Sequence, residues 1–137
     1  MKSKYFSDPA TAVDVFVETF RQVAADAQIA GIISQLKQLV YFDYTQDDPL
    51  VSFHVDSRGE GIQVAAGAPA DHPDLTIITS VDVAHQSWAN QINPVVAMAT
   101  GRIKSKGSAT ALLKLAPVLK LIAPIYKQVL ASKGIAV

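Results

Sequence analysis

The chain has 137 residues, half of them hydrophobic and only 18% charged, and it contains no cysteine. This length predicts a single domain spanning residues 1–137, and the lack of cysteine excludes both a disulfide framework and thiol catalysis. No apolar run reaches the roughly 20 residues of a membrane span, and no apolar signal region follows the basic N-terminus, so we expect a cytoplasmic protein.

The net charge of zero conceals an uneven distribution along the chain. Residues 1–82 contain all twelve Asp and Glu residues and five Lys and Arg residues, an excess of seven negative charges. Residues 83–137 contain seven Lys and Arg residues and no acidic side chain. The cations form either a solvated rim around apolar elements or a face that transiently contacts an anionic membrane surface. Nucleic acid is not an expected partner, because few aromatic residues interleave the cations and the acidic half would repel phosphates.

The N-terminal half predicts two helices followed by an antiparallel meander. Asp8 caps a helix that begins at Pro9, and apolar residues recur through it at helical spacing. A second helical segment follows, through Leu36. From Leu39 the period changes to two, which predicts strands over 39–44, 51–56 and 62–66 joined by short turns.

The C-terminal half predicts a fourth strand at 75–79 and then a helix capped by Ser80. Asn93-Pro94 starts a short helix, Thr100-Gly101 ends it, and the alternation around Ile103 predicts a fifth strand that ends at Gly107. Ser108 then caps a further helix. The last helix begins at Pro117, is apolar over most of its circumference, and is expected to kink at Pro124.

Three segments in this order resemble motifs of the sterol-carrier-protein lipid-transfer family: Pro73-Asp74-Leu75-Thr76-Ile77, Asn93-Pro94, and Thr100-Gly101-Arg102-Ile103-Lys104-Ser105-Lys106-Gly107. The resemblance covers roughly residues 39–121. Two positions depart from the pattern: Ser105 replaces a usual hydrophobic residue and Ser108 a common acidic one. The resemblance implies an α+β fold, with a five-stranded, mainly antiparallel sheet and helices on one face. It also implies an apolar tunnel that holds a sterol, fatty acid, fatty acyl-CoA or similar lipid.

The amphipathic pattern supplies candidate walls for such a tunnel. The predicted lipid-binding residues are Phe53, Val55, Ile62, Val64, Ile77, Trp88, Ile92, Val96, Met98, Leu112, Leu115, Leu119, Ile122 and Tyr126. Lys114, Lys120 or Lys127 at the mouth is predicted to hold an anionic headgroup. Burial of each ligand methylene contributes about 0.8 kcal/mol, so a long chain can bind usefully with few polar contacts. The predicted function is non-enzymatic binding and carrying of a hydrophobic ligand.

No catalytic residues, metal site or cofactor are predicted. His54, His72 and His85 lack metal-ligand spacing, and no nucleophile motif is present.

Three alternatives remain open at this point. A small cone-like isomerase or hydratase would use Tyr41, Asp43 and Tyr44. A homodimerising module would use the apolar C-terminal helix, with Leu119 and Ile122 at the interface. A carrier that delivers a hydrophobic intermediate to a biosynthetic enzyme is the third.

Overall fold

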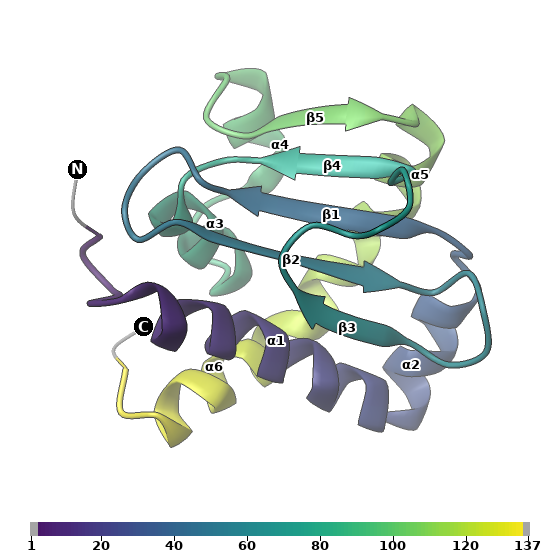
Figure 1. The fold of residues 1–137 in the computed structure, drawn as a ribbon, viewed down its shortest axis with the longest axis horizontal. Helices are drawn as coiled ribbons and strands as arrows, with labels where there is room; N and C mark the ends of the chain where they lie inside the picture. The colour runs from purple at the N-terminus through teal and green to yellow at the C-terminus, as the bar shows by residue number, and fades with distance from the viewer. Residues whose placement is uncertain (1–2, 136–137) are drawn as a thin grey trace.

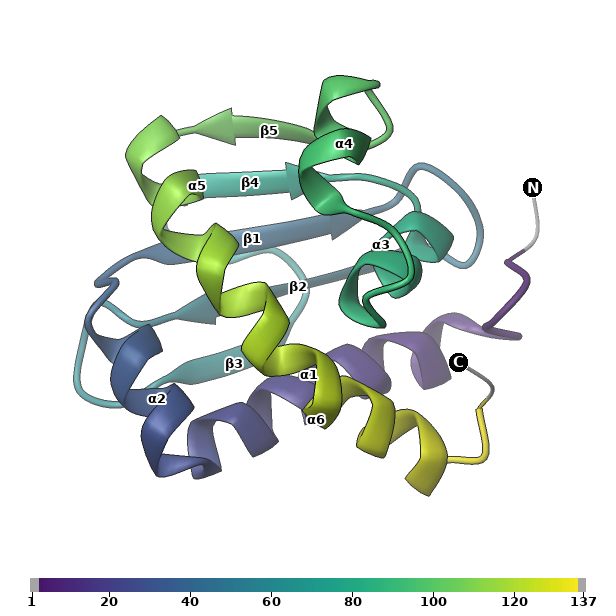
Figure 2. The ribbon, with the colours of Figure 1, turned by 180° about the vertical axis from the view of Figure 1, so that it is seen from behind.

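The computed structural model describes residues 3–135 and shows one five-stranded sheet with helices on a single face (Figure 1 and Figure 2). The strands are β1 (Leu39–Tyr44), β2 (Val51–Asp56), β3 (Gln63–Ala66), β4 (Leu75–Ile78) and β5 (Lys104–Gly107). The helices are α1 (Pro9–Ala25), α2 (Ala27–Ser34), α3 (Val81–Trp88), α4 (Pro94–Ala99), α5 (Ala109–Leu115), the 3-10 turn η1 (Ala116–Val118) and α6 (Leu119–Ser132). The predicted α+β class is confirmed.

The spatial order of the strands is β3-β2-β1-β4-β5. β1 and β4 are parallel, and the other three pairs are antiparallel, so the sheet is mainly antiparallel as predicted. Parallel neighbours need a crossover connection. Here the segment between β3 and β4 passes over the face of the sheet that carries no helices (Figure 1).

Each helix start that the sequence predicted from a capping residue is present. The side chains of Asp8, Ser80, Asn93 and Ser108 accept a hydrogen bond from a backbone N–H in the first turn of α1, α3, α4 and α5 respectively. These bonds satisfy donors that a helix leaves unpaired at its N-terminus. Local sequence therefore fixes where four of the helices begin.

The solid part of the core lies between α1 and the β1–β2 half of the sheet. Phe16 of α1 stacks on Phe53, with ring centroids 5.5 Å apart, and Phe53 stacks on Phe42 of β1 at 4.7 Å. Phe20 adds contacts to both strands, and all four rings are buried. Packed aromatic rings leave little free space here, because protein interiors reach crystal-like density.

The C-terminal helical run is longer and more continuous than the sequence led us to expect. Ala109–Ser132 is long and apolar enough, by length and composition only, to cross a membrane. Lys114, Pro117, Lys120 and Pro124 interrupt the apolar sequence, which is why no long apolar run was expected, but they do not break the helical run. About a third of its apolar window is buried, and the run lies diagonally across the helical face of the sheet (Figure 2). A helix that closes the core of a soluble domain passes the same test of length and composition.

Candidate binding cavity

A cavity of about 870 Å³ lies between the β1–β4 part of the sheet and the helices α3, α4, α5 and α6. Figure 2 shows the surrounding elements, with α4 on one side and the diagonal α5–α6 run on the other. Most of the side chains that line it are apolar. They are Phe42, Tyr44, Ile77, Ala84, Trp88, Ile92, Pro94, Val95, Met98, Ile103, Leu112, Leu113, Leu115, Ala116 and Leu119, with Thr79, Ser87, Asn90, Gln91, Asn93 and Lys120 as the polar members.

The cavity exists because this half of the sheet is covered by small or short elements. α4 has six residues and buries only Ala97. On the inner face of β5, Ser105 lies opposite Ile77 and Gly107 opposite Leu75, so the edge strand fills little volume. The large aromatic side chains of α1 lie over β1 and β2 instead. The departure at Ser105, noted from the sequence, thus falls on the inner face of the edge strand beside the cavity wall.

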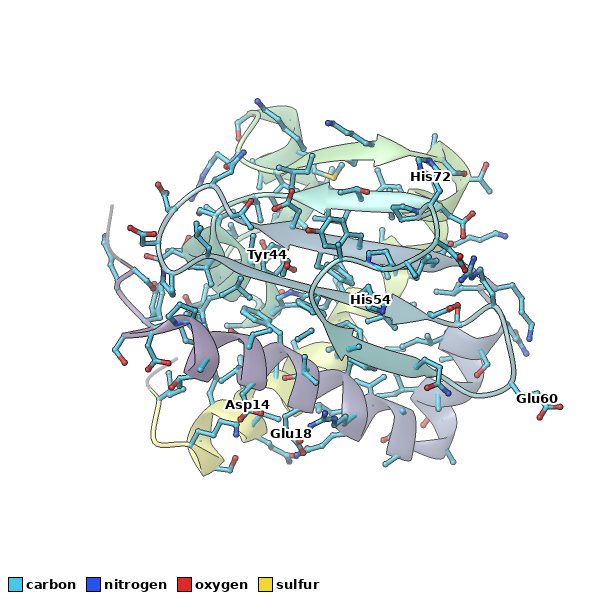
Figure 3. The ribbon with its side chains drawn as sticks, in the orientation of Figure 1. Asp14, Glu18, Tyr44, His54, Glu60 and His72 are labelled. Carbon is cyan, nitrogen blue, oxygen red and sulfur yellow. The ribbon has the colours of Figure 1, made fainter. Side chains whose placement is uncertain are left out.

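The floor of the cavity carries one buried polar pair. Trp88 Nε1 donates a hydrogen bond to the Tyr44 hydroxyl at 2.9 Å, and both side chains are buried. Burial raises the pKa of Tyr44 well above its usual value, because the phenolate would lose its hydration. Tyr44, at the end of β1 (Figure 3), therefore stays a neutral hydroxyl. It can offer a hydrogen bond to a ligand but has no tendency to ionise.

Seven of the fourteen predicted lipid-binding residues line this cavity: Ile77, Trp88, Ile92, Met98, Leu112, Leu115 and Leu119. They come from β4, α3, the α3–α4 connection, α4 and the C-terminal run. Their contact with a ligand remains a prediction.

The other seven lie elsewhere. Phe53, Ile122 and Tyr126 are fully buried in the packed core, because α1 covers them, and Val55 lies in the same core. Ile62 and Val64 pack against the core at the β3 edge of the sheet, the edge opposite β5. Val96 is 57% exposed on the outside of α4. Alternation and helical spacing identify a buried face correctly but do not say whether a side chain or a void lies opposite it.

Sequence reasoning omitted several lining residues that the structure brings together. Phe42 and Tyr44 were placed on one face of their strand, and Ile103 on the buried face of the last strand, yet none was proposed as a wall. Their periodicity was the available signal. Val95 and Leu113 at the mouth carried no such signal, because residues that are 66% and 73% exposed do not follow the core pattern.

Of the three lysines predicted to hold a headgroup, Lys120 lines the cavity, and it is the only charged residue among the described lining residues. Lys114 and Lys127 are exposed on the same helical run but do not line it. Contact of any of the three lysines with a ligand headgroup remains a prediction.

The lining residues offer little acid–base chemistry. They include no Asp, Glu or His. Tyr41 and Asp43 pair with His54 and Ser52 on the outer face of the sheet, whereas Tyr44 faces the cavity side. The three residues of the isomerase alternative are thus divided between two faces. Asp43 accepts a hydrogen bond from the Thr45 hydroxyl at 2.5 Å.

The histidines lie apart from one another and from the cavity lining. His54 on β2 and His72 in the β3–β4 connection are well separated (Figure 3), and His54 Nδ1 lies 2.9 Å from the carbonyl oxygen of Gly67. Within residues 3–135, no group of three His, Asp or Glu side chains is placed to hold a metal ion.

Comparisons with known proteins identify relatives over most of the chain. A sequence model of the SCP-2 sterol transfer family matches residues 17–120. Hydroxysteroid dehydrogenase-like protein 2 of Bos taurus is 26% identical over 98 residues, and the match covers 72% of this chain but 23% of that relative. The chain therefore spans about a quarter of the length of the curated relatives it matches.

Solved structures show the same architecture. Sterol carrier protein 2 from Yarrowia lipolytica (apo form) superimposes with a TM-score of 0.66 at 20% identity, over 84% of this chain and 94% of that one. The sterol carrier protein domain 2 of Helicoverpa armigera gives a TM-score of 0.68 at 17% identity, over 87% and 95%. At these identities the likeness establishes the fold alone.

Proposed function

We propose that this chain, which belongs to the SCP-2 sterol transfer family, binds one hydrophobic ligand in the cavity described above and carries it without chemical change. Family membership supports a role in lipid binding or transfer. The observation that carries the proposal is the cavity itself: about 870 Å³, walled mainly by aliphatic and aromatic side chains. The proposed ligand is a sterol, a fatty acid, a fatty acyl-CoA or a similar lipid.

The volume and lining suit partition of a long apolar group. Pockets for small molecules span about 300–1,000 Å³ and are mostly apolar with a few placed polar groups. Each buried methylene contributes about 0.8 kcal/mol, so a dozen of them supply on the order of 10 kcal/mol before the cost of association is subtracted. No strong polar contact is needed for useful affinity, and we expect loose selectivity among apolar ligands.

Polar groups of the wall suggest an orientation for an amphipathic ligand. Lys120 is exposed and is the only charged residue that lines the cavity within residues 3–135, so it suits a carboxylate or phosphate head at the rim. Tyr44 and Trp88 are buried at the floor, where a charge would be costly and a hydroxyl would be tolerated. An acyl chain would therefore enter tail first.

The absence of Asp, Glu and His from the described lining residues supports carrying rather than catalysis. The named activity of the longer dehydrogenase-like relatives does not transfer to this chain, because the match covers 23% of their length.

Filling the cavity tests the proposal. Met98→Trp enlarges a half-buried lining residue, and Val96→Trp introduces the same side chain at an exposed site on the same helix. Overpacking a filled site costs about 1–3 kcal/mol, so we expect Met98→Trp to weaken binding of a fluorescent fatty acid by about tenfold or more. Val96→Trp should bind as the parent does.

The titrations need a parallel check that both variants fold, by far-UV circular dichroism and urea unfolding. A folded Met98→Trp protein that binds the fatty acid with parental affinity would refute the cavity as the ligand site. Equal loss in both variants would also refute it, because the exposed residue does not line the wall.

A further inference from the structure

Exposed apolar side chains concentrate around the mouth of the cavity. Six large hydrophobic residues of the described chain are exposed, and four of them lie on α4 or on the C-terminal run. Val95 and Val96 of α4 are 66% and 57% exposed, and Leu113 and Leu121 are 73% and 40% exposed. Val95 and Leu113 also line the cavity, so this apolar surface is continuous with the mouth. Clustered apolar exposure of this kind marks an interaction site.

Lysines lie among these apolar residues on the outward side of the run. Five exposed residues of the run are spaced at intervals of one, six or seven positions, which places them within one sector of a helix. They are Leu113, Lys114, Lys120, Leu121 and Lys127. We call this surface, together with Val95 and Val96, the mouth face.

The mouth face carries charge of one sign. Lys114, Lys120 and Lys127 are exposed, and none forms an ion pair with a residue of the described range 3–135. Lys133, which does pair with Asp14, lies outside this surface. No acidic side chain occurs after Asp82, so α4 and the C-terminal run contribute no carboxylate side chain to this surface.

We infer that the mouth face docks on the surface of an anionic lipid bilayer. A helix with lysines and apolar residues on its outward face lies in the membrane interface, with the apolar groups among the headgroups and the cations on anionic lipids. Each lysine near such a surface is worth about fivefold in partition. The inference deepens the proposed carrier function, on which its purpose rests: a docked mouth lets an apolar ligand pass between bilayer and cavity without crossing water.

A second copy of the chain fits this surface less well than a membrane does. In a two-fold dimer the same patch would face itself, and Lys114, Lys120 and Lys127 would oppose the same three cations. Juxtaposed like charges cost several kcal/mol. Charge complementarity therefore favours an anionic occupant over self-association.

The chain contains no cysteine, so a single introduced cysteine can carry an environment-sensitive fluorophore. Val96→Cys and Leu121→Cys place it on the mouth face but outside the cavity wall, and Leu50→Cys places it at a residue that is 57% exposed between β1 and β2. With vesicles of phosphatidylcholine and phosphatidylserine, we expect a blue shift and increased emission at 96 and 121 but not at 50. Vesicles of phosphatidylcholine alone should give a much smaller response at 96 and 121.

A charge variant separates docking from ligand binding. The double variant Lys114→Gln with Lys127→Gln removes two cations that do not line the cavity. We expect its co-sedimentation with the anionic vesicles to be about thirtyfold weaker. Its binding of fatty acid in solution should equal that of the parent. Arg21→Gln with Lys37→Gln, on α1 and after α2, is the matched control and should retain docking. Added salt should weaken docking of the parent.

Three results would overturn the inference. They are absence of docking on anionic vesicles, equal response of the probe at Leu50, and a mouth face that is instead buried in a homodimer, seen as self-association in sedimentation velocity that Leu121→Gln abolishes. In each case, intact binding of fatty acid would leave the proposed function of the cavity unaffected. If the parent protein itself does not bind fatty acid, the proposed function is refuted separately.

Discussion

At the scale of single residues, Gly107 and Asp74 form a close contact that joins three elements. The Asp74 side chain accepts a hydrogen bond from the Leu39 backbone N–H at 2.8 Å. The backbone carbonyl oxygen of Asp74 accepts a second one, from the Ser108 N–H, at 2.9 Å. Gly107 has φ of +105°, and a β-carbon there would lie 2.3 Å from that same carbonyl oxygen. Both residues belong to the motifs recognised in the sequence, and their contact explains why the two motifs occur together.

Gly107→Ala should therefore destabilise the domain. The substitution forces a strained backbone conformation and displaces the oxygen that accepts the hydrogen bond from the Ser108 N–H, so we expect a loss of about 2 kcal/mol in the free energy of unfolding. Urea unfolding measures it. Gly59→Ala is the matched control, because nothing lies within 4 Å of its added carbon, and it should change stability by less than about 0.5 kcal/mol. Equal stability of the two variants would contradict the contact.

The outcome for individual wall residues shows what the sequence can and cannot specify. Period-two alternation placed Phe53 and Ile77 on the inner face of the sheet, and both are there. One meets Phe16 of α1 and the other meets the cavity. The difference depends on which helix covers which strand, a tertiary relation that the period of either strand does not contain.

At the scale of elements, α3 is tied to the N-terminal segment through a buried histidine. His85 stacks on Tyr5, with ring centroids 4.0 Å apart, and its Nδ1 lies 2.7 Å from the Tyr126 hydroxyl of α6. Ser3 donates a hydrogen bond to Asp82, and the Lys4 N–H donates another at 2.9 Å. His85 Nε2 has no hydrogen-bond partner among the described residues. Burial lowers the pKa of His85 to about 4, against a smaller opposing effect of Asp82.

This histidine should make stability depend on pH. Between pH 6.5 and about 4 the unfolded chain binds a proton at residue 85 and the folded chain does not, so stability falls as pH falls through that window. The slope is at most about 1.4 kcal/mol per pH unit. Chemical unfolding at several pH values should show that His85→Phe is less stable than the parent at pH 7 but has a shallower decline toward pH 4.

His72→Asn is the control, because His72 is exposed in the β3–β4 connection. It should keep the parental slope. A parental slope in His85→Phe would show that other groups cause the decline, carboxylates included.

Element boundaries were the most predictable feature, and the C-terminal run the least. Capping residues and the Asn93-Pro94 pair located the helix starts because their effect is local. The last two helices were predicted as separate pieces divided at Pro117, whereas a 3-10 turn at Ala116–Val118 joins them into one run. Proline is tolerated there because it falls in the first turn of the following segment.

At the scale of the whole molecule, the domain has two unequal halves. On one side α1 packs on β2, β3 and α6 around the stacked rings of Phe16, Phe42 and Phe53. On the other side, α4 and α5 cover the cavity and bury few side chains of their own. In α4 only Ala97 is buried, and in α5 only Ala111 and Leu115 are. Segments with few buried apolar contacts open at lower free energy than the core. The α+β class was predictable, and the family resemblance implied an apolar tunnel, but nothing in the sequence indicated that the cavity would occupy only the half beyond α1.

Ligand binding should therefore protect one half of the molecule more than the other. At a free fatty-acid concentration of about 100 times Kd, stabilisation approaches 2.7 kcal/mol, and the melting temperature should rise by on the order of 10 °C. Hydrogen exchange should slow most at the amides of α4 and α5, which line the cavity, and least in α1 and β2, which we expect to exchange only through global unfolding. Met98→Trp supplies the control without a ligand-filled cavity and should show neither change. Uniform protection of both halves would contradict a ligand held by the α4–α5 roof, because it would mean that the roof is as stable as the core before the ligand enters.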